Sequence, residues 1–215
     1  MFDGAWREES TLADGTRVVL RLLRREDAPL LQAGFDKLSP ESRYRRFLSA
    51  RTELGEEELR YLTELDGENH FAIGVQDEHG EGLGVARFVR LAGEPKVAEA
   101  AVTVVDGTQG KGLGRLLLQR LALAADERGV EWFRCEVLAS NEPMRQLLAQ
   151  LAPEAKQKHE GEVVRLDVPI AQLEAGAKEM PREHPLYRLF IGAAAGVLVL
   201  RGWLAHRPKG GQDGS

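Results

Sequence analysis

The 215-residue chain is predicted to fold as an α/β protein, with a mixed, mostly antiparallel central sheet flanked by helices. Three observations predict this class. An apolar, β-branched run at 97–105 is joined by a glycine-rich loop to a Leu- and Ala-rich stretch that ends near residue 128. Two adjacent hairpin signals precede this unit, so three successive strands are expected to run antiparallel. A further apolar run follows the expected helix, and strand–helix–strand connections of this kind make their two strands parallel.

The N-terminal half is expected to supply the first strands and a group of helices. Residues 1–13 are expected to form a loose arm. Three helices should begin near Asp27, Ser39 and Gly55, because a capping residue, a following proline or an acidic first turn marks each start. The strands expected in this half span residues 16–23, 71–76, 82–91 and 97–105.

The C-terminal half is expected to complete the domain with two helices and three strands. Leucines recur at helical spacing after the glycine loop, at Leu113, Leu117 and Leu121, and Gly129 suits the end of that helix. Asn141 is the expected cap of a shorter helix that runs to residue 151. The strands expected here span residues 131–138, 156–159 and 163–168, which gives a domain over 14–170.

Composition limits the classes of function. The net charge is −5, which does not indicate a nucleic-acid partner. Cys135 is the single cysteine, so no internal disulfide can form, and no Cys/His cluster has metal-ligand spacing. The first ten residues lack the basic and then apolar form of a signal peptide. We therefore expect a cytoplasmic protein without a metal site.

The glycine-rich loop has the properties of an anion-binding site. Glycines allow close approach of the backbone, and the first N–H groups of the following helix carry partial positive charge. A P-loop is excluded, because its first glycine would fall on Val105 and Gly112 follows Lys111. A dinucleotide fingerprint is excluded as well, since its third glycine would fall on Arg115. The remaining pattern is Q-x-x-G-x-G, from Gln109 to Gly114.

This pattern resembles the coenzyme A pyrophosphate loop of the GNAT N-acetyltransferase superfamily. Further phrases, in the same order along the chain, resemble the acetyltransferase domain of bacterial protein lysine acetyltransferases. They are LSPESRYRRF (38–47), HFAIGV (70–75), GVARFVR (84–90), AEAAVTVVD (98–106), QGKGLG (109–114) and VLASNEPM (137–144). The resemblance implies the GNAT fold, a sheet of about seven strands that splays between the family's fourth and fifth strands, at 97–105 and 131–138.

The resemblance also implies that acetyl-CoA is the acyl donor and that the acceptor is a primary amine. A protein lysine is the acceptor that the matching phrases favour. Glu99 matches the family's general base, although a strand-edge glutamate that faces water or pairs with an arginine is the alternative. The implied contacts to coenzyme A come from the strand, the loop and a later helix cap: Val102, Thr103, Val104, Gln109, Gly110, Lys111, Gly112, Leu113, Gly114, Arg115 and Asn141.

Two departures from the family pattern leave other functions open. Leu148 occupies the position of the tyrosine that protonates the leaving thiolate in many members, and Ala152-Pro153 replaces the usual Gly-Phe. We therefore name no general acid. The alternatives are acetylation of a small amine or a peptide N-terminus, and a non-catalytic module that senses acyl-CoA.

The last part of the chain changes in composition. Residues 171–185 are expected to be a polar linker, 186–204 an apolar helix and 205–215 a disordered tail. The apolar helix has nineteen residues with arginines near both ends, which suits either attachment to a membrane or docking on protein, including self-association. The sequence leaves these two alternatives open.

Overall fold

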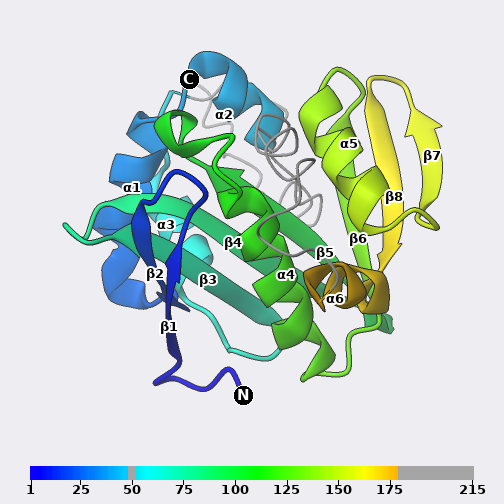
Figure 1. Ribbon diagram of the computed structural model, residues 1–215, viewed down its shortest axis with the longest axis horizontal. Coiled ribbons are helices and arrows are strands. Elements are labelled where there is room, and N and C mark those ends of the chain that lie inside the picture. The colour runs from blue at the N-terminus through cyan, green and yellow to red at the C-terminus, as the bar shows by residue number, and fades with distance from the viewer. Residues whose placement is uncertain (48–51, 179–215) are drawn as a thin grey trace, which may run out of the picture.

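The computed structural model describes residues 1–47 and 52–178 as one eight-stranded sheet with helices on both faces (Figure 1). The strand order is β1-β2-β3-β4-β5-β6-β8-β7, and every neighbouring pair is antiparallel except β5 and β6. The strands are β1 (Arg7–Thr11), β2 (Arg17–Leu22), β3 (His70–Asp77), β4 (Gly82–Leu91), β5 (Glu94–Val104), β6 (Trp132–Leu138), β7 (Lys156–Glu160) and β8 (Val163–Pro169). The predicted fold class and the parallel β5–β6 pair are confirmed.

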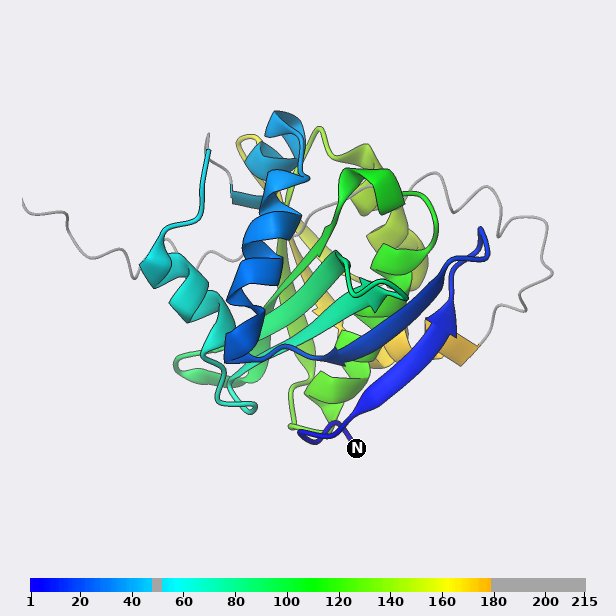
Figure 2. The ribbon, with the colours of Figure 1, turned by 90° about the vertical axis from the view of Figure 1, so that its left-hand side faces the viewer.

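The helices divide between the two faces. The helices are α1 (Ala28–Asp36), α2 (Pro40–Phe47), α3 (Glu56–Thr63), α4 (Leu113–Asp126), α5 (Glu142–Leu151) and α6 (Ile170–Lys178), with short 3-10 turns η1 (Arg25–Asp27) and η2 (Asp106–Thr108). Figure 2 shows α1, α2 and α3 on one side of the sheet and α4 on the other. The order of helices and strands along the chain agrees with the sequence prediction from residue 16 to residue 168.

The main core lies between the sheet and α4. Strand residues alternate between faces, so the apolar series Phe71, Phe88, Ala100 and Phe133 all point to one side and are at most 1% exposed. Leucines of α4, including Leu117 and Leu121, cover them and are fully buried. A smaller cluster lies among α1–α3 and consists of Phe35, Leu38, Phe47, Leu54 and Leu62. Each face of the sheet is therefore covered by its own helix layer.

Three expectations for the ends of the domain need correction. Residues 1–13 are not a loose arm, because β1 pairs with β2 and Phe2 is 7% exposed. β1 also brings the sheet to eight strands rather than about seven. The expected polar linker begins instead with α6, which packs against α4 and buries Leu173 completely.

The segments expected at 186–204 and 205–215 lie outside the described residues. Within residues 1–47 and 52–178, no helix has the length and apolar character needed to cross a bilayer.

Candidate active site

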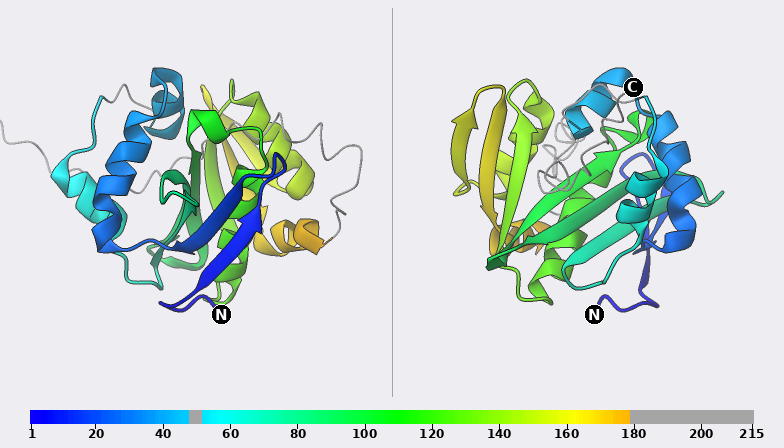
Figure 3. Two further views of the ribbon diagram at one scale, coloured as in Figure 1. Left: turned by 60° about the vertical axis from the view of Figure 1, so that its left-hand side comes forward. Right: turned by 180° about the vertical axis from the view of Figure 1, so that it is seen from behind.

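The two central strands separate at Glu99. Strands β5 and β6 pair in register at Val97–Trp132, Ala98–Phe133 and Glu99–Arg134, and among the described residues no later pair follows. β5 nevertheless continues to Val104 and β6 to Leu138. Figure 3 shows, in its right-hand view, the two strands meeting at one end and moving apart toward the other. The splay expected from the sequence is therefore present, and it begins at the predicted base.

The backbone of β5 presents alternate peptide groups to this opening. The carbonyl of Lys96 accepts a hydrogen bond from the Glu131 N–H on the β6 side (2.8 Å), whereas the Val105 N–H donates to Leu83 on the β4 side (3.0 Å). Because peptide groups alternate along a strand, the even-numbered residues Val102 and Val104 face the opening. The expectation for Thr103 differs from this geometry, because its peptide group faces β4.

The glycine loop takes the conformation expected of an anion-binding site. Gly110 and Gly112 have φ angles of 76° and 87°, in the left-handed region that favours glycine. Gly112 is the N-cap of α4, and the first intrahelical bond runs from the Leu116 N–H to the Gly112 carbonyl (3.1 Å). The first N–H groups of α4 therefore lie at the positive end of the helix dipole, where helix geometry provides no acceptor from a preceding turn.

Gln109 supports the loop from within. Its side-chain amide donates to the Val104 carbonyl (3.2 Å) and to the Asp106 carboxylate (2.9 Å). Asp106 also accepts from the Ser39 N–H (2.9 Å), which ties the end of β5 to the start of α2. Burial tends to raise the pKa of Asp106, but hydrogen bonds from Ser42 and Ser39 outweigh it and lower the pKa. This role of Asp106 was not identified from the sequence. Its position directly after the predicted strand was the one feature of the sequence that could have indicated it.

The charge of Lys111 is directed to another part of the chain. Its ammonium group lies 2.9 Å from the carboxylate of Asp14, in the turn between β1 and β2. The Ala13 N–H donates to the Lys111 carbonyl as well (3.3 Å). These contacts fasten the loop to the N-terminal hairpin, so Lys111 has a bracing role in addition to the predicted contribution of charge. Arg115 lies in the first turn of α4 and is partly exposed.

Glu99 lies on the face of the sheet opposite α4. A Cβ atom built at Gly84 would meet Leu117 and Leu113 of α4, and Gly84 is paired with Val104. Alternation therefore points Val104 and Val102 toward α4, and Glu99 toward the side of α1–α3. The glutamate is 9% exposed. A ligand held at the α4 end of the opening and a second molecule arriving from the other face would meet near this carboxylate.

A cluster of buried polar side chains shares the face of Glu99. Arg87 is 2% exposed and donates to the Leu62 carbonyl (2.7 Å), while its other terminal nitrogen lies 3.2 Å from Nε2 of His70. The ring of Tyr61 packs on His70 with 4.9 Å between centroids. Burial raises the pKa of Tyr61, the positive charge of Arg87 opposes this, and the negative charge of Glu99 adds to it. No local sequence pattern marks Arg87 as buried, because its partners come from α3 and from the start of β3.

The other predicted residues take structural positions beside the opening. Asn141 is fully buried and caps α5 by accepting from the Met144 N–H (3.4 Å). Leu148 is fully buried in α5, so this position belongs to the core. Cys135 is also fully buried, and burial raises the pKa of its thiol, with the charges of Asp167 and Glu99 adding to the effect. A protonated, inaccessible thiol of this kind is a core residue. No group of three or more metal-ligating side chains occurs in the part of the chain that the structure describes.

Comparison with known proteins agrees with this geometry. A family model described as an acetyltransferase (GNAT) domain matches residues 17–152. The acetyltransferase Pat of Mycolicibacterium smegmatis is 37% identical over 116 residues, which are 54% of this chain and 34% of that protein. The acetyltransferase PA5475 of Pseudomonas aeruginosa is 32% identical over 144 residues, which are 66% of this chain and 77% of that protein.

A solved structure extends the similarity to three dimensions. The GNAT domain of S. lividans PAT superposes with a TM-score of 0.72 at 28% identity, and the match covers 79% of this chain and 99% of that domain. The aligned region spans about a third of the length of the mycobacterial Pat protein. The family match includes the loop, the opening between β5 and β6, and Glu99. The chain is therefore a member of the GNAT acetyltransferase family.

Proposed function

We propose that this protein is an acetyl-CoA-dependent N-acetyltransferase that acetylates a primary amine, and that the amine is a protein lysine. The separation of β5 and β6 at Glu99 carries the proposal, because it puts a buried carboxylate at the point where an extended ligand and an acceptor could meet. The lysine acceptor is supported by the phrases shared with bacterial protein lysine acetyltransferases and by the similarity to Pat.

The opening fits coenzyme A in both of its chemical parts. A pyrophosphate requires several N–H donors and positive potential, which the loop at 109–112 and the N-terminus of α4 offer. The pantetheine arm is extended and carries amides, so it can pair with the peptide groups of Val102 and Val104 as an added strand would. Asn141 fixes the start of α5 on the far side of the opening. Acetyl-CoA, when bound, supplies the acetyl group.

Glu99 is assigned the role of general base. A lysine ammonium group has a pKa of about 10.4, so it must lose a proton before its nitrogen can attack a carbonyl. The Glu99 carboxylate would accept that proton, directly or through one water molecule. The N–H group of Val102 faces the opening beyond the last β5–β6 pair and can donate to a carbonyl oxygen on which negative charge develops. No side chain is assigned to protonate the thiolate, which can leave at its ordinary thiol pKa.

The test is release of free thiol from acetyl-CoA with three acceptors: a lysine-containing protein, a small amine and none. The wild-type protein should release thiol with the protein acceptor above the rate with no acceptor. Glu99→Gln should lower kcat by about 100-fold or more, since positioned proton transfer contributes about 10²–10⁴-fold. The KM of this variant for acetyl-CoA should stay unchanged. The Glu99 side chain lies on the face of the sheet opposite α4, whereas the proposed contacts to coenzyme A lie at the N-terminus of α4.

Glu136→Gln is the matched control, because Glu136 is a similarly buried carboxylate on β6, at 5% exposure. It should retain a kcat within a few-fold of the wild type. An equal loss of kcat in both variants would contradict the assignment of Glu99 as the general base. It would indicate instead that activity depends on buried negative charge in general. Binding of acetyl-CoA without turnover on any acceptor would refute the enzymatic proposal, and turnover with the small amine alone would refute the protein acceptor.

A further inference from the structure

A cavity of about 90 Å³ lies between α1–α3 and the sheet, on the face opposite α4. Its walls are mostly apolar and come from helix and strand residues, including Leu30, Phe35, Leu62 and Val85. Glycines at 34, 74 and 82 leave the space open, and a Cβ atom built at Gly34 would meet nothing within 4 Å. The lining residues include Thr103 and Val105, at the end of β5 and just after it, but none from the glycine loop, α4 or β6.

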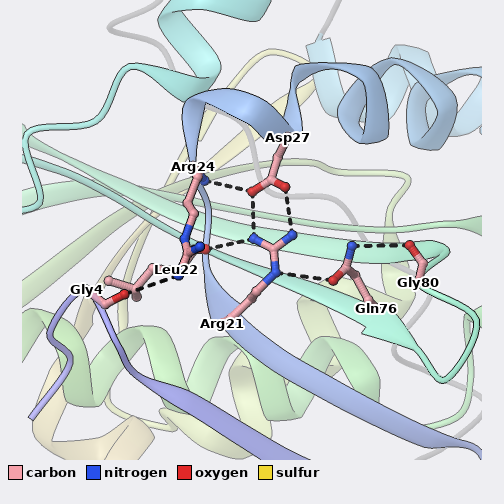
Figure 4. Close-up of polar contacts among 7 residues, drawn as sticks. All are labelled: Gly4, Arg21, Leu22, Arg24, Asp27, Gln76 and Gly80. Carbon is pink, nitrogen blue, oxygen red and sulfur yellow. Dashed lines mark hydrogen bonds and ion pairs between the residues drawn. The ribbon is translucent and has the colours of Figure 1, made fainter.

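The charged groups in the wall are unequal in sign. Among the described residues they are three guanidinium groups, from Arg21, Arg46 and Arg87, and one carboxylate, from Asp27. Arg21 and Asp27 form a two-pronged ion pair with both N–O distances at 2.7 Å (Figure 4). Asp27 also accepts from the Arg24 N–H (2.8 Å), so its carboxylate is committed to this pair rather than to capping α1. The negative charge of Asp27 is thus already neutralised by Arg21.

Arg87 is the group whose bonding is incomplete. Its terminal nitrogens have partners in Leu62 and His70, but within the described residues its Nε has no hydrogen-bond partner, although the side chain is 2% exposed. Burial, and then the positive charge of Arg46, lowers the pKa of Arg87 to about 9, so the group stays charged at neutral pH. A buried N–H of a charged group with no acceptor is costly, and an anion would satisfy it.

We propose that this cavity binds the anion of a short-chain monocarboxylic acid of two to four carbons. The carboxylate would accept from the Arg87 Nε–H, in a charge-assisted hydrogen bond, and the alkyl chain would lie against the apolar wall. Size sets the upper limit, because an apolar cavity of about 150 Å³ holds benzene and this one is smaller. A dianionic phosphate is disfavoured, since the apolar wall offers few donors to replace its hydration.

The first experiment compares butyrate, butyramide and butylamine on the full chain, with binding followed by titration calorimetry and by the shift in melting temperature. Butyrate should bind saturably, and the isosteric butyramide and the cationic butylamine should bind at least ten-fold more weakly. Addition of coenzyme A should leave butyrate binding intact, because no lining residue of the cavity belongs to the glycine loop or to α4. Equal binding of butyrate and butyramide, no saturable binding of butyrate, or its displacement by coenzyme A would overturn the proposal.

Two variants locate the site. Gly34→Leu fills the cavity without removing a charge and should weaken butyrate binding at least ten-fold. Ala33→Leu is its matched control, since it adds the same side chain to an exposed position of α1 and should bind as the wild type does. Arg87→Gln should also abolish the preference for butyrate over butyramide. Should Arg87→Gln fail to fold, the Gly34 and Ala33 pair decides: equal butyrate affinity in these two variants would overturn the assignment to this cavity.

Discussion

Replacing His70 with glutamine should remove a pH-dependent part of the stability. His70 is 9% exposed, and burial, followed by the positive charge of Arg87, lowers its pKa from 6.5 to about 4, with Asp66 opposing in part. Between these two values the unfolded chain binds more protons at this position than the folded chain does, so stability falls as the pH falls. The contribution is complete above about pH 6.5 and is lost by about pH 4.

The difference of about 2.5 pKa units corresponds to a total of about 3 kcal/mol, and about 2 kcal/mol of it should disappear between about pH 7.5 and about pH 5. Urea denaturation gives the free energy of unfolding of the wild type and of His70→Gln at both pH values. The loss between the two pH values should be larger in the wild type by this amount. Glutamine keeps an acceptor for the Arg87 N–H group, so the variant isolates titration from loss of the hydrogen bond.

His79→Gln is the control, since the His79 side chain is 78% exposed in a turn. Its stability should vary with pH as that of the wild type does. The reasoning fails if His70→Gln and the wild type lose the same free energy over this range, because His70 would then not be held neutral by its surroundings.

Two further predictions concern the frame of the site. Gly84→Ala should lower the free energy of unfolding, measured in urea, by about 1–3 kcal/mol, because its Cβ would lie 2.9 Å from the Thr103 carbonyl oxygen. Gly82→Ala is the control, since its Cβ would lie 3.6 Å from the Leu30 carbonyl oxygen, and it should change stability by under about 1 kcal/mol. Equal effects of the two alanines would contradict the steric argument. Asp106→Ala should cost about 1–3 kcal/mol, because it leaves the Ser39 N–H without its acceptor and the Gln109 amide with the Val104 carbonyl alone. Coenzyme A should raise the melting temperature of this variant less than that of the wild type. An unchanged response to coenzyme A would show that the loop does not depend on Asp106.

The unit from β5 to α4 could be predicted from sequence because its signals are local. A β-branched run, glycines at fixed spacing and a leucine repeat each define their own structure within a few residues. The same holds for Asn141, whose capping role depends on an N–H three residues ahead.

Other features depend on partners that are distant along the chain. β1 has the sequence REEST, which has no apolar alternation, and it forms a strand because β2 offers it an edge. Arg87 is buried although arginine is usually exposed, and the Leu62 carbonyl of α3 supplies an acceptor for it. Asp106 binds Ser39, which lies 67 residues earlier. The pattern of a single sequence carries no information on such long-range contacts. The cavity beside Arg87 is formed by contacts of this kind, so it could not be predicted either.

The N-terminal segment holds α4 at three places along its length. The first two residues contact Glu127 at one end, with the Met1 ammonium 3.0 Å and the Phe2 N–H 2.8 Å from its carboxylate. Glu8 binds Arg120 in the middle through two bonds of 2.7 and 2.8 Å, and Asp14 binds Lys111 at the other end. The first fourteen residues thus brace the helix whose N-terminus forms the anion site. Differences in cofactor affinity between the wild type and a variant that lacks the Glu8–Arg120 pair would therefore report on this bracing of α4 rather than on the loop itself.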